Sequence, residues 1–224
     1  MISVIIPALN EGDHIAGCIK ALKAEDCGCE IIIADGGSTD RTKEVAAGFQ
    51  GVKVISTEKG RGNQMNAGAA EAKGEVLLFL HADTILEEGW ATDLLSLFEN
   101  DSISGGAFTF SIQLPAWKYR LVEAWVKLRF KLCSMPYGDQ AIFVRKSTFD
   151  EIGGYSNIPL MEDVDLIKRL KKLGPIRMLD KKAITSERRW IKKGLIRTMA
   201  TNQIIMLLYK LGVNPFKLAR IYYR

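Results

Sequence analysis

The sequence predicts an α/β protein built on an open, mostly parallel, Rossmann-like sheet with helices on both faces and further helices at the C-terminus. Short runs of β-branched and apolar residues alternate with segments of helical periodicity through the first half of the chain. The first of these runs, 2–7, is nearly all apolar instead of alternating with polar residues, which is typical of a strand covered on both faces. Such a strand–helix order predicts a parallel sheet.

The first half contains four strand–helix pairs. Apolar residues at Ile15, Ile19 and Leu22 have helical spacing. Asp40 can cap the second helix, and Gly74 is expected at the C′ position of the third. The expected strands are 2–7, 30–35, 52–56 and 76–80, and the expected helices are 15–23, 41–48, 64–73 and 90–98.

The pattern changes after residue 105, where strands become fewer and helices longer. Gly174-Pro175 gives a clear stop to one of these helices. Four aromatic residues near helical spacing (Trp117, Tyr119, Trp125 and Phe130) are expected in the core. The expected strands here are 107–112 and 141–145, and the expected helices are 117–131, 146–152, 162–173, 193–211 and 215–222.

Length and charge narrow the possible functions. A chain of 224 residues with a formal charge of +5 can form one large domain with a sizeable core. The positive excess falls late, in 168–197, which is compatible with an anionic ligand or an anionic membrane surface. Nothing resembles a nucleic-acid recognition motif, so no nucleic-acid partner is expected. Oligomeric state is not readable from the sequence.

The expected lack of targeting signals and the pattern of cysteines predict a cytoplasmic location, either free or at the inner face of a membrane. No signal peptide and no transmembrane segment is expected, because the apolar run 204–209 is too short to span a bilayer. That run can instead pack in the core or lie on a membrane surface. The four cysteines lack zinc-site spacing and are expected to be reduced thiols.

Polar residues follow each of the first four strands. Because ligands of open α/β sheets bind outside the carboxyl ends of the strands, these loops are expected to meet at one site. Loops that only reverse the chain have no need of carboxylates at every crossing. The four loops are Pro7-Ala8-Leu9-Asn10-Glu11, Asp35-Gly36-Gly37-Ser38-Thr39-Asp40, Lys59-Gly60-Arg61-Gly62-Asn63-Gln64 and His81-Ala82-Asp83.

Individual residues in these loops suit a nucleotide. Asp35 at a strand end can accept a hydrogen bond from a base, and Gly36 lets the backbone approach a ring or a phosphate. Arg61, between two glycines, suits a pyrophosphate. Asp40 serves either this site or only as a helix cap. The chain lacks the Gly-x-x-x-x-Gly-Lys-Ser/Thr signature of a P-loop.

His81 and Asp83 are candidate metal ligands. In an extended segment, residues two apart face the same way, so both side chains could point at one ion. A carboxylate together with phosphates suits Mg²⁺, and the imidazole favours Mn²⁺. The alternative is a histidine that is simply hydrogen-bonded at a strand end.

Glu162 and Asp163 form an acidic pair after a Gly153-Gly154-Tyr155 turn and at the start of an amphipathic run. A carboxylate held at the rim of a cleft can act as a general base. Acidic residues at a helix N-terminus are also favoured by the helix dipole alone. The pair gains a functional interpretation from the loops described above.

These blocks, in this order, resemble the inverting glycosyltransferases of family 2, which have the GT-A fold, and in particular small stand-alone bacterial members. The resemblance covers about residues 1–190. His81-Ala82-Asp83 stands where the family has Asp-x-Asp, so His81 replaces the first aspartate. Arg189 and Trp190 match the end of a Gln-x-x-Arg-Trp block in which Ser186 replaces the glutamine.

The resemblance implies a role for each matching residue. Asp163 would be the catalytic base, with Glu162 beside it, and Asp83 would hold a Mg²⁺ or Mn²⁺ ion, with His81 as a further possible ligand. The acceptor hydroxyl would attack the anomeric carbon of a nucleotide sugar, by this resemblance a UDP-sugar, with inversion of configuration. The nucleotide contacts would be Pro7, Ala8, Asn10, Glu11, Asp35, Gly36, Arg61 and Ala82.

The acceptor side is expected to involve Asp139, Gln140, Arg189 and Trp190. Asp139 and Gln140 can line a sugar or acceptor pocket, although a turn uses the same residues. The acceptor itself is not named by the sequence, and the late basic and apolar residues are compatible with a lipid-linked or membrane-adjacent one.

The predicted organisation is a glycosyltransferase domain, 1–190, and a C-terminal helical tail, 191–224. Within the domain, 1–83 would bind the nucleotide and 84–190 would hold the acceptor and the base. Two alternatives stay open: a nucleotidyltransferase on a similar sheet, and a catalytically inactive nucleotide-binding module. The first would ordinarily carry a Gly-rich basic loop after the first strand, which 7–11 lacks.

Overall fold

A computed structural model describes residues 1–100 and 102–223, in which eight strands form one sheet. The strand order is β3-β2-β1-β4-β7-β6-β8-β5. The strands are β1 (Ile2–Ala8), β2 (Glu30–Asp35), β3 (Val52–Ser56), β4 (Val76–Phe79), β5 (Thr84–Leu86), β6 (Gly105–Ile112), β7 (Ile142–Arg145) and β8 (Ile176–Thr185).

Helices connect the strands and complete the chain. A short 3-10 helix, η1 (Gly138–Gln140), precedes β7. The α-helices are α1 (Ile15–Ala24), α2 (Thr42–Ala47), α3 (Arg61–Glu71), α4 (Trp90–Leu97), α5 (Trp117–Cys133), α6 (Lys146–Glu151), α7 (Glu162–Leu170), α8 (Arg188–Lys193), α9 (Leu195–Lys210) and α10 (Pro215–Tyr222).

The sheet changes direction at β7. Strands β1 to β4 pair in parallel, as the strand–helix alternation predicts. β7 pairs antiparallel with both β4 and β6, and β6 then runs parallel to β8. The predicted α/β class with a mostly parallel sheet is confirmed. The reversal lies at the centre of the sheet, beside the carboxyl ends of β1 and β4.

Two apolar layers cover the two faces of the sheet. In β1, Val4 and Ile6 point to the layer that contains Ile15 of α1. Ile5, between them, points to the layer that contains Met65 of α3. All three β1 side chains are completely buried. The continuous apolar sequence of β1 follows directly from this burial on both faces.

Two strands were not predicted. β5 spans only three residues, Thr84–Leu86, and pairs with β8. β8 carries several charged residues, which obscure the strand pattern, but its burial alternates in part along the strand. It is held by pairing with β6 and β5, contacts that are distant in sequence. β5 and β8 therefore form because they pair with strands that are distant in sequence, and their local sequence does not predict them.

Glycines move several helix boundaries from their predicted positions. α3 begins at Arg61, not at residue 64, directly after Gly60 with φ +137°. The predicted helix 193–211 is two helices, because Gly194 has φ +78° and ψ 148° and interrupts the chain between them. Gly74 does not cap α3, which ends at Glu71. Gly74 instead packs against the backbone of Ser3, where a Cβ would not fit.

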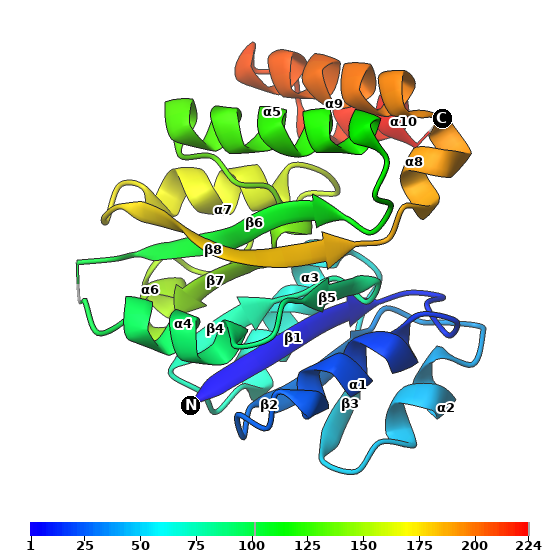
Figure 1. Cartoon of the computed structure of the whole chain (residues 1–224), viewed down its shortest axis with the longest axis vertical. Helices are drawn as coiled ribbons and strands as arrows, with labels where there is room; N and C mark the ends of the chain where they lie inside the picture. Colours follow the sequence, from blue (N-terminus) through cyan, green and yellow to red (C-terminus); the bar gives the residue numbers. More distant parts are fainter. Residues whose placement is uncertain (101, 224) are drawn as a thin grey trace.

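The long helices of the second half gather at one end of the molecule. Figure 1 shows α5, α9 and α10 there, and α1 and α2 at the opposite end. The expectation that the α5 aromatic residues are core is wrong for Trp117 and Trp125, which are 75% and 42% exposed, whereas Tyr119 is buried. Within residues 1–100 and 102–223, no helix is both long enough and apolar enough to cross a bilayer.

Gly68 lets α3 lie directly on β1, and its replacement is expected to destabilise the fold. A Cβ at this position would overlap Cγ2 of the buried Ile5. We expect Gly68→Ala to lower the free energy of unfolding by about 1–3 kcal/mol, although alanine is the better helix former. The measurement is urea denaturation followed by circular dichroism.

Gly17→Ala in α1 is the matched control, because a Cβ there meets nothing within 4 Å and the residue is exposed. Helix propensity alone should make this variant more stable, by up to about 1 kcal/mol. Equal stabilisation by both substitutions would contradict the close packing of α3 on β1.

Candidate active site

A cavity of about 400 Å³ opens at the carboxyl end of the parallel strands, where the sequence places the site. Its wall is built from both halves of the chain. Most of the predicted site residues line it, namely Pro7, Glu11, Arg61, His81, Ala82, Asp83, Asp139, Glu162, Asp163, Arg189 and Trp190. Five do not line it: Ala8, Asn10, Asp35, Gly36 and Gln140.

The loops after β1 and β2 are tied together by side chains. Asn10 adopts a left-handed conformation with φ +56°. Its Oδ1 accepts a hydrogen bond from the Thr39 backbone N–H at 2.9 Å, and its own N–H donates to Ser38 Oγ at 2.9 Å. Asp40 accepts hydrogen bonds from the N–H groups of Gly12 and Thr42, both at 3.0 Å. Arg41 takes the N-cap position of α2, and Asp40, one residue earlier, joins the first residue of that helix to the first loop.

Asp35 lies beneath the second loop and is completely buried. Its Oδ2 accepts hydrogen bonds from the N–H groups of Gly37 and Ser38, both at 3.0 Å. Its Oδ1 is buried and has no hydrogen-bond partner in the described part of the chain. A buried acceptor without a partner costs free energy, so this oxygen is a candidate for a ligand's hydrogen-bond donor.

Ala8 and Gly36 contribute through their backbones, behind the cavity. The Ala8 carbonyl accepts hydrogen bonds from Gly36 N–H at 2.9 Å and from Gln64 Nε2 at 2.8 Å. Gln64 is buried in α3, and a Cβ at Gly36 would meet its side chain at 2.9 Å. Gly36 is needed here because a larger residue would collide with the Gln64 side chain. Gly36 does not line the cavity.

Arg61 joins the two halves of the cavity wall. Its Nη1 lies 3.3 Å from Glu162 Oε1, across 101 residues of sequence. The Glu162 side chain is 4% exposed and the Arg61 side chain 48%. Burial raises the pKa of the Glu162 carboxyl, and Arg61 acts in the opposite direction. The guanidinium of Arg61 is thus held by a buried acid through Nη1, and the residue also lines the cavity.

Asp163 is fixed in place by backbone donors. Its Oδ2 accepts a hydrogen bond from Gly138 N–H at 2.6 Å, and its Oδ1 accepts one from Val164 N–H at 2.7 Å. A Cβ at Gly138 would lie 3.4 Å from Asp163 Oδ2 and 3.5 Å from His81 Nε2. The absence of a side chain at residue 138 therefore leaves space where Asp163 and His81 approach each other.

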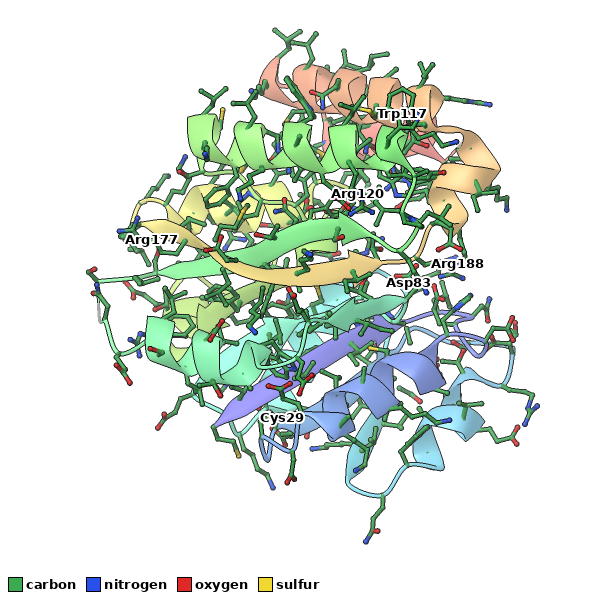
Figure 2. The ribbon with its side chains drawn as sticks, in the orientation of Figure 1. Cys29, Asp83, Trp117, Arg120, Arg177 and Arg188 are labelled. Carbon is green, nitrogen blue, oxygen red and sulfur yellow. The ribbon has the colours of Figure 1, made fainter. Side chains whose placement is uncertain are left out.

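Asp83 pairs with an arginine that the sequence analysis did not single out. Arg188 Nη2 lies 2.9 Å from Asp83 Oδ2 and 2.8 Å from Glu11 Oε2. Figure 2 shows Asp83 and Arg188 next to each other near the end of the sheet. Arg188 belongs to α8, at the Ser186–Trp190 block, and its single positive charge is shared between the two carboxylates. The basic character of this block was visible in the sequence, but its partner was not.

His81 and Asp83 do not lie in an extended segment, as the sequence analysis assumed. Thr84 N–H donates to the His81 carbonyl at 3.1 Å, which makes 81–84 a turn. Both side chains nevertheless line the same cavity. Burial, together with the charges of Arg61 and Arg189, lowers the pKa of His81 to about 4, while Asp83 acts in the opposite direction. The imidazole is therefore neutral near neutral pH.

Asp139 and Gln140 have different roles. Asp139 lines the cavity, and burial raises its pKa. Gln140 is completely buried, and its side chain accepts from Arg129 Nη2 at 2.9 Å and from Tyr137 N–H at 3.1 Å. It also donates to the Phe108 carbonyl at 3.3 Å. The expectation that Gln140 lines the pocket is wrong, because its groups are used inside the protein.

The C-terminal helices complete the cavity. Arg189 donates to Asn202 Oδ1 at 2.7 Å, and its guanidinium lies 5.3 Å from the Tyr222 ring. Trp190 is nearly buried and faces Phe110 at 6.4 Å between ring centroids. Lining residues that sequence reasoning missed include Tyr137, Gly138, Lys193, Asn202, Tyr222 and Tyr223. No local motif marks them, since α9 and α10 reach the site only through folding.

Comparison with known proteins identifies the family. A family model described as glycosyl transferase family 2 matches residues 3–156. The chain belongs to glycosyltransferase family 2. A PGL/p-HBAD biosynthesis glycosyltransferase of Mycobacterium tuberculosis is 32% identical over 167 residues, which cover 70% of this chain and 63% of that protein. The chain thus spans less than two thirds of this relative's length. The probable glycosyltransferase YdaM of Bacillus subtilis is 27% identical over 77% of this chain and 47% of its own.

Solved structures of glycosyltransferases share the fold of this family 2 chain. Glucosyl-3-phosphoglycerate synthase from Mycobacterium tuberculosis, in complex with Mn²⁺, uridine diphosphate and its product, superposes with a TM-score of 0.67 at 20% identity. The match covers 95% of this chain and 80% of the synthase. TarS of S. aureus in complex with UDP-GlcNAc gives 0.65 at 18% identity, over 84% of this chain and 58% of TarS. At these identities the likeness concerns the fold.

The donor set of this family 2 chain fits a divalent ion that takes most of its ligands from a nucleotide. The described residues contain no cluster of three His, Cys, Asp or Glu side chains that could hold an ion alone. Asp83 offers one carboxylate to the cavity, and the neutral His81 offers an imidazole nitrogen. Mg²⁺ is typically bound by one or two carboxylates, substrate phosphates and waters, and Mn²⁺ accepts the same oxygen ligands.

Arg188 competes with such an ion for Asp83. We expect Arg188→Gln to tighten Mn²⁺ binding in the presence of UDP about two- to fivefold, since an exposed ion pair contributes about 0.5–1 kcal/mol. Isothermal titration of Mn²⁺ into the UDP-saturated protein measures this. The control is Arg41→Gln, which removes an exposed ion pair with Glu44 in α2. Weaker Mn²⁺ binding by Arg188→Gln would mean that this arginine contacts the ligand instead.

The low pKa of His81 should make stability depend on pH. The unfolded chain has a histidine pKa of about 6.5 and the folded chain one of about 4. The unfolded state therefore binds the proton first, and stability is lost as the pH falls from about 6.5 towards 4. We expect His81→Gln to lose less unfolding free energy than the wild type between about pH 7 and about pH 5. Parallel losses in urea titrations of both proteins would contradict this.

Proposed function

We propose that this chain transfers a sugar from a nucleoside diphosphate donor, a UDP-sugar, to an acceptor hydroxyl with inversion at the anomeric carbon. The observation that carries the proposal is the convergence of two carboxylates, Asp83 and Asp163, on one cavity from opposite halves of the chain. Membership of family 2 and the nucleotide-bearing complexes of similar fold support it. A nucleotidyltransferase receives no support from any of these observations.

Asp163 is the proposed general base. Its two backbone hydrogen bonds hold the carboxylate towards the cavity, and the residues around it leave room for an acceptor. The acceptor oxygen forms a bond to the anomeric carbon from the face opposite the diphosphate, and the bond from that carbon to the diphosphate oxygen breaks. The hydroxyl proton moves to Asp163, and the diphosphate leaves with the bonding electron pair.

Arg61, Arg189 and Lys193 are proposed to stabilise the departing diphosphate. All three line the cavity, so their charges are fixed where negative charge develops. Glu162 is proposed as a positioning residue, because it is nearly buried and holds Arg61. A divalent ion at Asp83, when bound, would supply further charge neutralisation at the phosphates.

The nucleoside is proposed to lie over the first two loops. Pro7 and Glu11 line the cavity on this side, and Asn10 fixes the two loops against each other. Asp35 Oδ1 is the proposed acceptor for a base N–H, since it is a buried oxygen beneath the second loop that has no partner among the described residues. A base reaches it only if the Gly36-Gly37 segment shifts, because Asp35 is completely buried.

Hydrolysis of the donor tests this proposal without knowledge of the acceptor, since water can take the acceptor's place. We expect Mn²⁺-dependent release of UDP from a UDP-sugar. Asp163→Asn should lower the rate about a hundredfold or more while UDP affinity is kept, because a base is lost but the nucleotide contacts are not. Asp83→Ala should lose the Mn²⁺ dependence. Calorimetry gives the affinities and a coupled assay the rates.

Asp93→Asn is the control, since Asp93 is an exposed carboxylate on α4, away from the cavity. It should behave as the wild type. If Asp163→Asn released UDP at the wild-type rate, another group would be the base. If the wild type bound UDP but hydrolysed no UDP-sugar and transferred none to a panel of hydroxyl acceptors, the inactive nucleotide-binding module would be the better description.

A further inference from the structure

Helix α5 presents a continuous apolar stripe to solvent. At 100° per residue, the spacing of its exposed large side chains keeps them on one side of the helix. They are Trp117, Leu121, Trp125, Leu128 and Leu132, and their exposed fractions run from 42% to 75%. Figure 2 shows Trp117 at the end of the molecule where α5 and α9 lie. Soluble proteins rarely leave so many large apolar side chains together in water without a partner.

Helix α9 presents a second stripe beside the first. Ile196, Ile204, Leu207 and the following Leu211 are 54–83% exposed and share one side of the helix. The opposite side, with Ile205 and Met206, packs on α10 and the start of α7. The exposed side therefore has no part in the core.

The two helices are neighbours. Tyr119 and Val122 of α5 form one apolar cluster with Trp190, against which Leu195 and Met199 of α9 pack. Figure 1 shows α5 and α9 running together along the same end of the molecule. We call the two exposed stripes together the α5/α9 face.

The charge around the α5/α9 face is strongly positive. Residues 188–223 contain eight Lys and Arg and no Asp or Glu. On α5, Lys127 and Lys131 are exposed beside the stripe, and on α9 Arg197 and Lys210 are exposed in the same way. An apolar stripe with tryptophans, flanked by lysines and arginines, is the composition of helices that lie in the plane of an anionic bilayer surface.

We propose that the α5/α9 face binds the surface of a bilayer that contains anionic lipids. Apolar side chains would enter the boundary between headgroups and acyl chains, while the flanking cations contact phosphates. A second copy of the chain is a poorer occupant, because a two-fold interface through this face would bring like charges together. The proposed occupant of the α5/α9 face is therefore lipid, and the experiment below would also detect self-association of the chain.

The helices that form or support the α5/α9 face also contribute to the cavity, which bears on the kind of acceptor that the protein would use. Trp190, Asn202 and Tyr222, on the helices that bear or support the face, also line the cavity. A protein bound through this face would hold the cavity close to the bilayer. The acceptor would then be an amphiphile whose hydroxyl lies at the membrane surface, a statement that rests on the proposed function.

Vesicle sedimentation tests the surface directly. We expect the full chain to pellet with phosphatidylcholine vesicles that contain phosphatidylglycerol, and about tenfold less with phosphatidylcholine alone. Raising the salt should weaken the binding, because the electrostatic part is screened. Leu121→Glu and Ile196→Glu, at side chains 61% and 83% exposed, should each reduce the partition coefficient about tenfold. Because both side chains are exposed, their replacement should leave the fold intact, and circular dichroism checks this.

Leu95→Glu on α4 is the matched control, with the same change at a 44% exposed leucine away from the face. It should bind vesicles as the wild type does. Equal binding by the Leu121→Glu and Leu95→Glu variants, or no preference for anionic vesicles, would overturn the proposal. So would a dimer in sedimentation velocity that Leu121→Glu converts to a monomer without any vesicle binding.

The same proteins separate this inference from the proposed function. UDP binding and UDP-sugar hydrolysis, measured without lipid, should be unchanged in Leu121→Glu and Ile196→Glu. Vesicle binding without any UDP-sugar turnover would refute only the proposed function. Turnover without vesicle binding would refute only the α5/α9 face as a lipid surface.

Discussion

The contact between the start of α3 and the start of α7 holds the site together. Arg61 and Glu162 form an ion pair there, and further along α3 Asn66 exchanges two hydrogen bonds of 2.8 Å with the backbone of Tyr155, in the segment between α6 and α7. These contacts join segments roughly 90 to 100 residues apart in sequence. In addition to the backbone hydrogen bond that Asp163 accepts from Gly138, they link the segment that carries Asp163 to the loops after the parallel strands. The chemistry proposed for this chain therefore depends on a contact between helices.

The parallel half of the fold was predictable because its sequence signals are local. β2 begins and ends where its apolar run does, since it is buried on both faces, and the edge strand β3 also has its predicted bounds. β8 was missed because its charged residues sit in a strand held by partners far away in the chain. Trp117 and Trp125 were wrongly predicted to be buried, because helical spacing identifies a face of a helix but does not say whether that face is inside.

The site was predictable to the extent that short motifs carry it. The loops ending in Glu11, Arg61 and Asp83, and the pair at Glu162, reach one cavity as expected. Gln140 resembled a site residue only because turns and pockets use the same side chains. The pairing of Arg188 with Asp83 and Glu11 needs three separate segments to meet, so no spacing in the sequence could reveal it.

Some residues that line the cavity lie outside the segment that the family model matches. The family model ends at residue 156, whereas Asp163, Trp190 and Tyr222 all come later in the chain. The cavity is thus built from a stretch that the family model covers and from a later stretch that it does not cover. On the proposed assignment, an exchange of the segment after residue 156 between relatives would replace the base and the C-terminal helices together, while the loops after β1 and β2 would stay the same.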